Sequence, residues 1–199
     1  MSNVETFRPR SGFVMAFSAF FAISAFTYIN ILDYGLMGGL PSIGWGLVLS
    51  TIFYLIFIHP KVIFFDEGLT IVNPLTTITL GWHDVVEIDA RFTMYVIHRE
   101  SGTKIHAFAA QAPGRYHSRT VHPNEVKGMR VGDSGMIRAG ESPRTSSGAA
   151  TAIARARLEQ FERFHSQGSV EFSSKFNKSA AIIGTAFFAI ALVIQVIHP

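Results

Sequence analysis

The chain has eight histidines and several carboxylates that could take part in acid–base chemistry or bind a metal, and it has no Cys. Thiol catalysis and Cys-ligated zinc are therefore excluded. His98 and His106 flank a turn predicted at Ser101-Gly102. A two-residue loop would point their imidazoles to opposite faces, and a one-residue bulge would align them. His117 and His122 have no carboxylate cluster nearby. The pattern favours ordinary histidines over a metal site, and we expect no metal or cofactor.

Nucleophilic catalysis would require a base and an orienting acid brought close to the nucleophile. The tetrad Gly132-Asp133-Ser134-Gly135 has the order of a serine-protease nucleophile motif, but it lies in a Gly-rich stretch whose surroundings do not match that class. His83-Asp84 places a base beside an acid without an identifiable nucleophile. We therefore predict no catalytic residue and no enzymatic activity, and we do not expect a small-molecule substrate.

The distribution of charge indicates a membrane protein. From Ser11 to Pro60 the only charged residue is Asp33, and from Ser179 to Pro199 there is none, whereas the middle of the chain has an ordinary charge content. A helix of about 20 apolar residues crosses a hydrocarbon core. The sequence therefore predicts a transmembrane hairpin over 13–59 and a third transmembrane helix over 179–197.

Within that hairpin, the first apolar run covers 13–32 and the core of the second covers 43–58, with a loop over 33–42. A cleaved signal peptide is the alternative explanation of the first run. That alternative is disfavoured because a signal has only about 7–15 apolar residues before its cleavage site.

Basic residues beside the apolar runs predict the orientation. Arg8, Arg10, Lys61, Lys175 and Lys178 flank one set of helix ends, and the other set has no Lys or Arg. Cytoplasmic flanks carry the excess of Lys and Arg. We expect a multi-pass protein of the plasma membrane, with the N-terminal tail (1–12) and the middle domain in the cytoplasm and the C-terminus outside.

Polar and small residues in the apolar runs are candidates for helix contacts. Asn30 and Gln195 have similar predicted depths, so they either bond to each other or meet interfacial water. Small residues recur at four-residue spacing and favour close approach of helices. They are Ser18, Ala22, Ala181, Thr185 and Ala189.

The middle of the chain is predicted to be a β domain over 60–111. Five or six short antiparallel strands follow one another between Lys61 and Ala110, with tight turns at Asp66-Glu67-Gly68 and around Gly102. No helix interrupts them, so we expect a meander that closes towards a small barrel.

A Gly- and Pro-rich stretch over 112–148 separates the strands from an amphipathic helix predicted over 149–168, with Ser147 as its N-cap. The helix is expected to bury Ala150, Ala154, Leu158 and Phe161, with Ile153 and Phe164 beside them. The stretch before it is net basic and either contacts anionic lipid or is a solvated loop. Its candidate lipid- or partner-facing residues are Arg115, Arg119, Lys127 and Arg130.

Five features occur in an order shared with a known group: the Pro60 start, the Asp66-Glu67-Gly68 turn, the Asn73-Pro74 break, the Trp82 step and the Gly102 turn. In this order the chain resembles the bacterial PH-like domains of actinobacterial membrane proteins, a group that includes the low-molecular-weight protein antigen type. The resemblance implies a bent antiparallel barrel of seven strands capped by a C-terminal helix. The chain departs from the group in its basic insertion and third membrane helix.

The predicted architecture is therefore three transmembrane helices with a PH-like antiparallel β-barrel capped by a helix. Asp66 and Glu67 would repel a phosphorylated headgroup at the first hairpin, which disfavours phosphoinositide binding. The sequence favours an interaction module that binds a protein partner, for instance by strand addition, and membrane lipid. The alternatives are an accessory subunit of a respiratory or envelope complex and, less favoured, an interfacial enzyme. We expect no nucleic acid partner, because no recognition motif accompanies the basic stretch.

Overall fold

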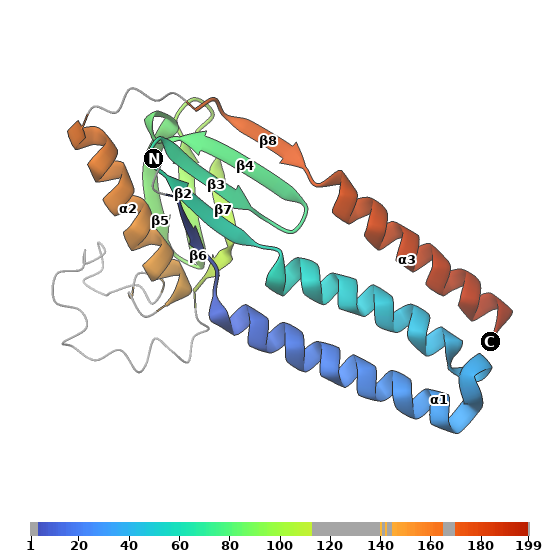
Figure 1. The fold of residues 1–199 in the computed structure, drawn as a ribbon. Helices are drawn as coiled ribbons and strands as arrows, with labels where there is room; N and C mark the ends of the chain where they lie inside the picture. Colours follow the sequence, from blue (N-terminus) through green and yellow to red (C-terminus); the bar gives the residue numbers. More distant parts are fainter. Residues whose placement is uncertain (1–3, 113–139, 141, 143–144, 165–169, 199) are drawn as a thin grey trace. The chain divides into compact units, whose positions relative to one another are not determined.

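The computed structural model describes residues 4–112, 140, 142, 145–164 and 170–198 (Figure 1). The chain divides into two compact units. The β unit comprises Met1–Pro9 and Pro60–Lys175, and the helical unit comprises Arg10–His59 and Phe176–Pro199.

The strands of the described residues form two antiparallel sheets. A five-stranded sheet has the order β1-β2-β3-β4-β8, and a three-stranded sheet has the order β5-β6-β7. The prediction of consecutive antiparallel strands between Lys61 and Ala110 is confirmed. The bounds are β1 Glu5–Phe7, β2 Lys61–Phe65, β3 Gly68–Val72, β4 Thr76–Gly81, β5 Val85–Ala90, β6 Thr93–His98, β7 Lys104–Gln111 and β8 Ser173–Phe176.

The two sheets do not close into the barrel that the sequence predicted. A short 3₁₀ helix, η2 (Trp82–Asp84), carries the chain from β4 to β5, and these strands do not pair with each other among the described residues. At the far corner the side chain of Asn73 bridges the sheets. Its Nδ2 donates to the carbonyl of His106 and its Oδ1 accepts from the amide of Phe108, both at 2.8 Å. The side-chain amide of Asn73 thus links the turn between β3 and β4 to β7.

The core of the β unit lies between the sheets because alternate residues of each strand point inward. Burial alternates along β2 and β6, as expected for strands with one solvated face. Trp82 is the largest fully buried side chain, and its Nε1 donates to the carbonyl of Phe65 at 3.1 Å. The other core residues include Val62, Phe64, Leu69, Ile71, Leu80, Met94 and Val96.

Helix α2 (Ser146–Phe164) packs on this core through Ala150 and Ala154, which are fully buried. Its N-cap is Thr145, whose Oγ1 accepts from the amide of Gly148 at 3.0 Å, so the predicted N-cap at Ser147 is wrong. Ser147 is instead buried in the first turn and donates to the carbonyl of Gly140 at 2.7 Å. Phe164 is 74% exposed, so the predicted apolar face ends at Phe161.

The helical unit contains α1 (Arg10–Phe53), a π-helical turn, η1 (Tyr54–Ile58), and α3 (Lys178–Ile197). Gly35 breaks α1 with φ of 73°, a conformation that costs Gly little and other residues more. The loop predicted over 33–42 is therefore reduced to one non-helical residue. Two helices, Arg10–Ile58 and Lys178–Ile197, are long and apolar enough to cross a membrane.

The two halves of α1 lie against each other, as Figure 1 shows. Thr27 Oγ1 donates to the carbonyl of Ser42 at 3.4 Å. Glycines allow the approach at two levels, since a Cβ on Gly12 would lie 2.5 Å from the carbonyl oxygen of Phe57 and one on Gly46 would lie 3.2 Å from Ile23. The halves thus form a hairpin turned at Gly35.

Candidate functional site

The surface of the helical unit is the most unusual feature of the chain, because large apolar side chains cover it. A soluble monomer rarely exposes contiguous apolar patches larger than a few hundred Å². Large apolar side chains are exposed along both halves of α1 and along α3. They include Val14, Phe17, Phe21, Phe26, Leu32, Leu36, Met37, Ile182, Val193 and Val196. This surface is suited to a hydrocarbon environment.

Asn30 and Gln195, for which the sequence left open a mutual bond or contact with interfacial water, do not bond to each other. Asn30 Nδ2 donates to the carbonyl of Phe26 in its own helix at 2.9 Å. Gln195 Oε1 accepts from Trp45 Nε1 at 3.2 Å, and the ring of Trp45 also contacts Phe188 edge-on at 5.8 Å. Gln195 therefore joins α3 to the second half of α1 through Trp45, which was not among the predicted contact residues.

The predicted small residues are not the ones that bring the helices together. Ser18, Ala22, Thr185 and Ala189 are exposed, and Ala181 is half-buried. The close contact between α1 and α3 is made by Gly44, where a Cβ would lie 3.1 Å from the Cα of Ala191. Small residues thus mediate helix contact as expected, but the contact occurs at Gly44 and Ala191 and not at the predicted positions.

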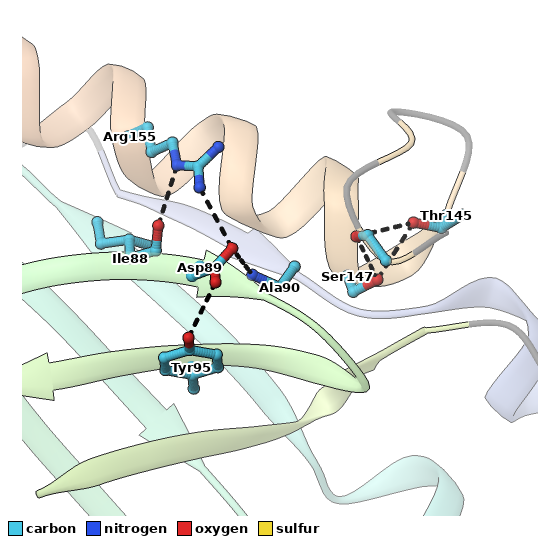
Figure 2. A network of polar contacts seen from close by, with 8 residues as sticks. Ile88, Asp89, Ala90, Tyr95, Thr145, Ser147 and Arg155 are labelled. Carbon is cyan, nitrogen blue, oxygen red and sulfur yellow. Dashed lines mark hydrogen bonds and ion pairs between the residues drawn. The ribbon is translucent and has the colours of Figure 1, made fainter. Parts of the chain in front are cut away.

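The main polar cluster of the β unit is centred on Asp89, a carboxylate only 6% exposed. Figure 2 shows its partners. Asp89 accepts from the amide of Ala90 at 2.7 Å and from the hydroxyl of Tyr95 at 2.9 Å. Arg155 of α2 lies 3.6 Å from the same carboxylate and donates through Nε to the carbonyl of Ile88 at 3.0 Å.

This cluster attaches α2 to β5 and β6. Burial of an ion is costly unless hydrogen bonds and an opposite charge compensate it, and Asp89 has both. The Arg155 contact also occupies a carbonyl of β5, a strand at the edge of its sheet. We assign the cluster a structural role, because its hydrogen bonds and ion pair join α2 to β5 and β6.

Tyr95→Phe tests that role. The variant removes a donor from a buried carboxylate, so we expect the free energy of unfolding to fall by about 1–3 kcal/mol. Chemical denaturation of the full chain in detergent, followed by circular dichroism, measures the change. Thr93→Val on the same strand, which loses a hydroxyl bonded to the exposed His106, is the control and should change stability by less. Equal effects of the two variants would contradict the assignment.

A second ionic cluster occupies the first hairpin. Arg157 of α2, with a side chain 11% exposed, lies 3.2 Å from Asp66 and 3.5 Å from Glu5. It joins α2, the turn between β2 and β3, and β1. Because this cation faces two carboxylates of the chain itself, the hairpin does not present the free basic cluster that a phosphorylated headgroup requires.

His83, His98 and His106 lie at separate places in the β unit. His98 is buried with Nδ1 3.0 Å from Ser101 Oγ, whereas His106 is exposed and contacts Thr93 at 2.9 Å. His83 Nε2 lies 3.3 Å from its neighbour Asp84. Within the described residues no three potential metal ligands come together.

Several predicted candidates lie outside the described residues. These are the basic residues Arg115, Arg119, Lys127 and Arg130, the tetrad 132–135, and the pair His117 and His122. Asp89 was not among the predicted site residues, although an acid among apolar strand residues is a signal of a buried polar contact.

The chain was also compared with known proteins. No family model, no curated protein and no solved structure matches it.

Proposed function

We propose that this chain is a membrane-anchored, non-catalytic interaction module with a PH-like β domain at the cytoplasmic face. The apolar helices hold the β unit at the membrane, and the β unit binds a protein partner. The observation that carries this proposal is the concentration of exposed apolar side chains on α1 and α3. The β unit, by contrast, has a buried core of its own.

The sheet register supports a membrane hairpin. β1 precedes α1 and β2 follows η1, yet Phe7 pairs with Val62 in the same sheet. Residues 8–61 therefore leave and return to one side of a membrane, which requires an even number of crossings. The first half of α1 precedes Gly35, and the second half continues through η1. At 1.5 Å per residue each is about 35 Å long, which is enough for one crossing.

The same sheet constrains the third helix. β8 is a neighbour of β4, so the residues before α3 begin on the side of the sheet domain. One crossing by α3 then places the C-terminus on the opposite side. Arg8, Lys61 and Lys175 adjoin these helices on the domain side, which supports the cytoplasm as that side.

Within the described part of the β unit, the turn between β5 and β6 is well suited to a protein partner. Phe92 is 75% exposed there, and the guanidinium of Arg91 lies 5.3 Å from its ring centroid. Aromatic and Arg residues are enriched among the energetically dominant contacts of interfaces. Strand addition to β5 is disfavoured, because Arg99 and Arg155 donate to its carbonyls at Val85 and Ile88.

Purification of the tagged chain in mild detergent tests this proposal. We expect a stoichiometric partner to co-purify and Phe92→Ala to weaken its binding about 30-fold, as for a residue worth about 2 kcal/mol. Phe164→Ala is the matched control, because Phe164 is 74% exposed on α2.

A partner retained equally by both variants would refute the assignment to Phe92. A stable complex of membrane proteins that does not depend on Phe92 would instead favour an accessory subunit. A chain that purifies alone would contradict the interaction module.

A further inference from the structure

Charge is segregated along the strands of the five-stranded sheet. β1 begins at Glu5 and is followed by Arg8, and β2 begins at Lys61 and is followed by Asp66-Glu67. β8 is preceded by Glu171 and contains Lys175. β3 and β4 contain no charged residue.

The three cations lie at one end of this sheet. Lys61 pairs with Val72 at the end of β3, and Phe7 pairs with Val62, so Arg8 and Lys61 come next along two adjacent strands. β8 runs opposite to β4 in Figure 1, so Lys175 lies towards the same end. The acidic residues are therefore at the opposite end.

The two ends differ in how their charges are compensated. At the acidic end, Glu5 and Asp66 face the guanidinium of Arg157. At the basic end, no ion pair with Arg8, Lys61 or Lys175 occurs among the described residues. Like charges on adjacent strands destabilise a sheet, so the neighbouring Arg8 and Lys61 would be stabilised by an external anion.

An apolar side chain lies at the same end. The turn between β3 and β4 contains Leu75, which is 44% exposed. In the strand order, Leu75 lies between β2, which begins at Lys61 beside Arg8, and β8, which contains Lys175. At about 4.8 Å per strand, these two positive groups are roughly 14–19 Å apart. One small phosphate cannot bridge that distance, whereas a lipid surface presents many.

We propose that this basic sheet end, formed by Arg8, Lys61, Lys175 and Leu75, binds the phosphate groups of anionic lipids in the membrane leaflet. The proposal rests on the membrane anchoring proposed above and adds the surface and the class of lipid. It assigns the contact to the sheet end, separately from the basic stretch over 112–148. Cations near an anionic leaflet each add to membrane binding.

The test uses the full chain purified in a neutral detergent. Phosphatidylglycerol or phosphatidylcholine is added, and the thermal unfolding midpoint is recorded against the mole fraction of lipid. We expect phosphatidylglycerol to raise the midpoint more than phosphatidylcholine does. In the triple variant Arg8→Gln, Lys61→Gln and Lys175→Gln, the half-saturating mole fraction should rise about fivefold for each cation removed.

Two variants keep the result interpretable. Arg99→Gln, Lys104→Gln and Arg163→Gln, made together, remove the same charge from exposed positions elsewhere and should leave the half-saturating fraction unchanged. The second triple variant, Arg8→Lys, Lys61→Arg and Lys175→Arg, changes the same positions but keeps their charge. It should retain the preference for phosphatidylglycerol, which separates loss of lipid binding from misfolding.

Equal losses in both glutamine variants, or a wild-type chain without preference, would overturn the inference. So would an equal midpoint shift with inorganic phosphate alone. Alkaline extraction of membranes separates this failure from failure of the proposed function. A chain that stays in the membrane fraction without lipid preference refutes only the headgroup surface, and a chain released by alkali refutes the anchoring.

Discussion

Trp82→Ala is expected to lower the free energy of unfolding of the β unit by about 3–5 kcal/mol, as for other buried aromatic residues. Trp82 is 1% exposed and lies in the turn that carries the chain from one sheet to the other. Its amide also donates to the carbonyl of Glu67 at 3.0 Å, so the residue connects the first hairpin to the second sheet. The substitution opens a cavity at the place where the two sheets join.

Denaturant titration of the full chain in detergent, followed by far-ultraviolet circular dichroism, measures this effect. Trp82→Phe is the control, because it keeps much of the apolar volume and loses the bond from Nε1 to Phe65. We expect it to cost less than Trp82→Ala. Trp45→Phe, in the helical unit, should leave the unfolding of the β unit unchanged. A cost below about 1 kcal/mol for Trp82→Ala would contradict its role in the core.

The strands between Lys61 and Ala110 could be predicted because their own residues specify them. Each has β-branched or aromatic residues and ends at a turn. β1 and β8 could not be predicted in this way. Glu5–Phe7 and Ser173–Phe176 are short and lack an apolar alternation, and they are strands because they pair with β2 and β4. Their formation depends on edges supplied by distant parts of the chain.

The local residue pattern also could not predict that the strands form two sheets and not a closed barrel. The alternation in β7 predicts a strand but not its register, which shifts against β6 between Thr93 and Tyr95. Asn73 was interpreted as a strand break, which it is, but its bonds to His106 and Phe108 join residues far apart in the sequence.

Composition predicted the apolar helices, whereas the contacts within them followed from geometry. The loop predicted over 33–42 contains Gly38, Gly39 and Pro41, yet only Gly35 has non-helical dihedral angles. Gly39 instead packs against Ile31, where a Cβ would lie 2.6 Å from the side chain. A glycine pattern alone does not distinguish a turn from a close helix contact.

The polar contacts of the candidate sites show the same limit. No contact of Arg155 or Arg157 was predicted from the sequence, although both residues lie on α2. Their partners Asp89 and Asp66 lie on strands and turns far from α2 in the sequence. Pairs of this kind depend on how the helix docks, and docking is not encoded in local periodicity.

The sidedness of the chain gives the second large effect. Because the protein has no Cys, single substitutions to Cys are unique labels. Tyr34 is 71% exposed beside the Gly35 turn of α1, and Glu100 is exposed in the turn between β6 and β7. A hairpin that crosses the membrane twice places these two residues on opposite sides. A reagent that cannot cross the membrane should therefore label one of the two positions in intact cells and not the other.

Labelling of intact cells with a membrane-impermeant maleimide tests the central claim most directly. We expect Tyr34→Cys to react in intact cells and Glu100→Cys to react only after the membrane is opened, with the Cys-free chain as the blank. Reaction of Glu100→Cys in intact cells would place the β unit outside, and equal reaction of both variants in intact cells would show that the hairpin does not span the membrane.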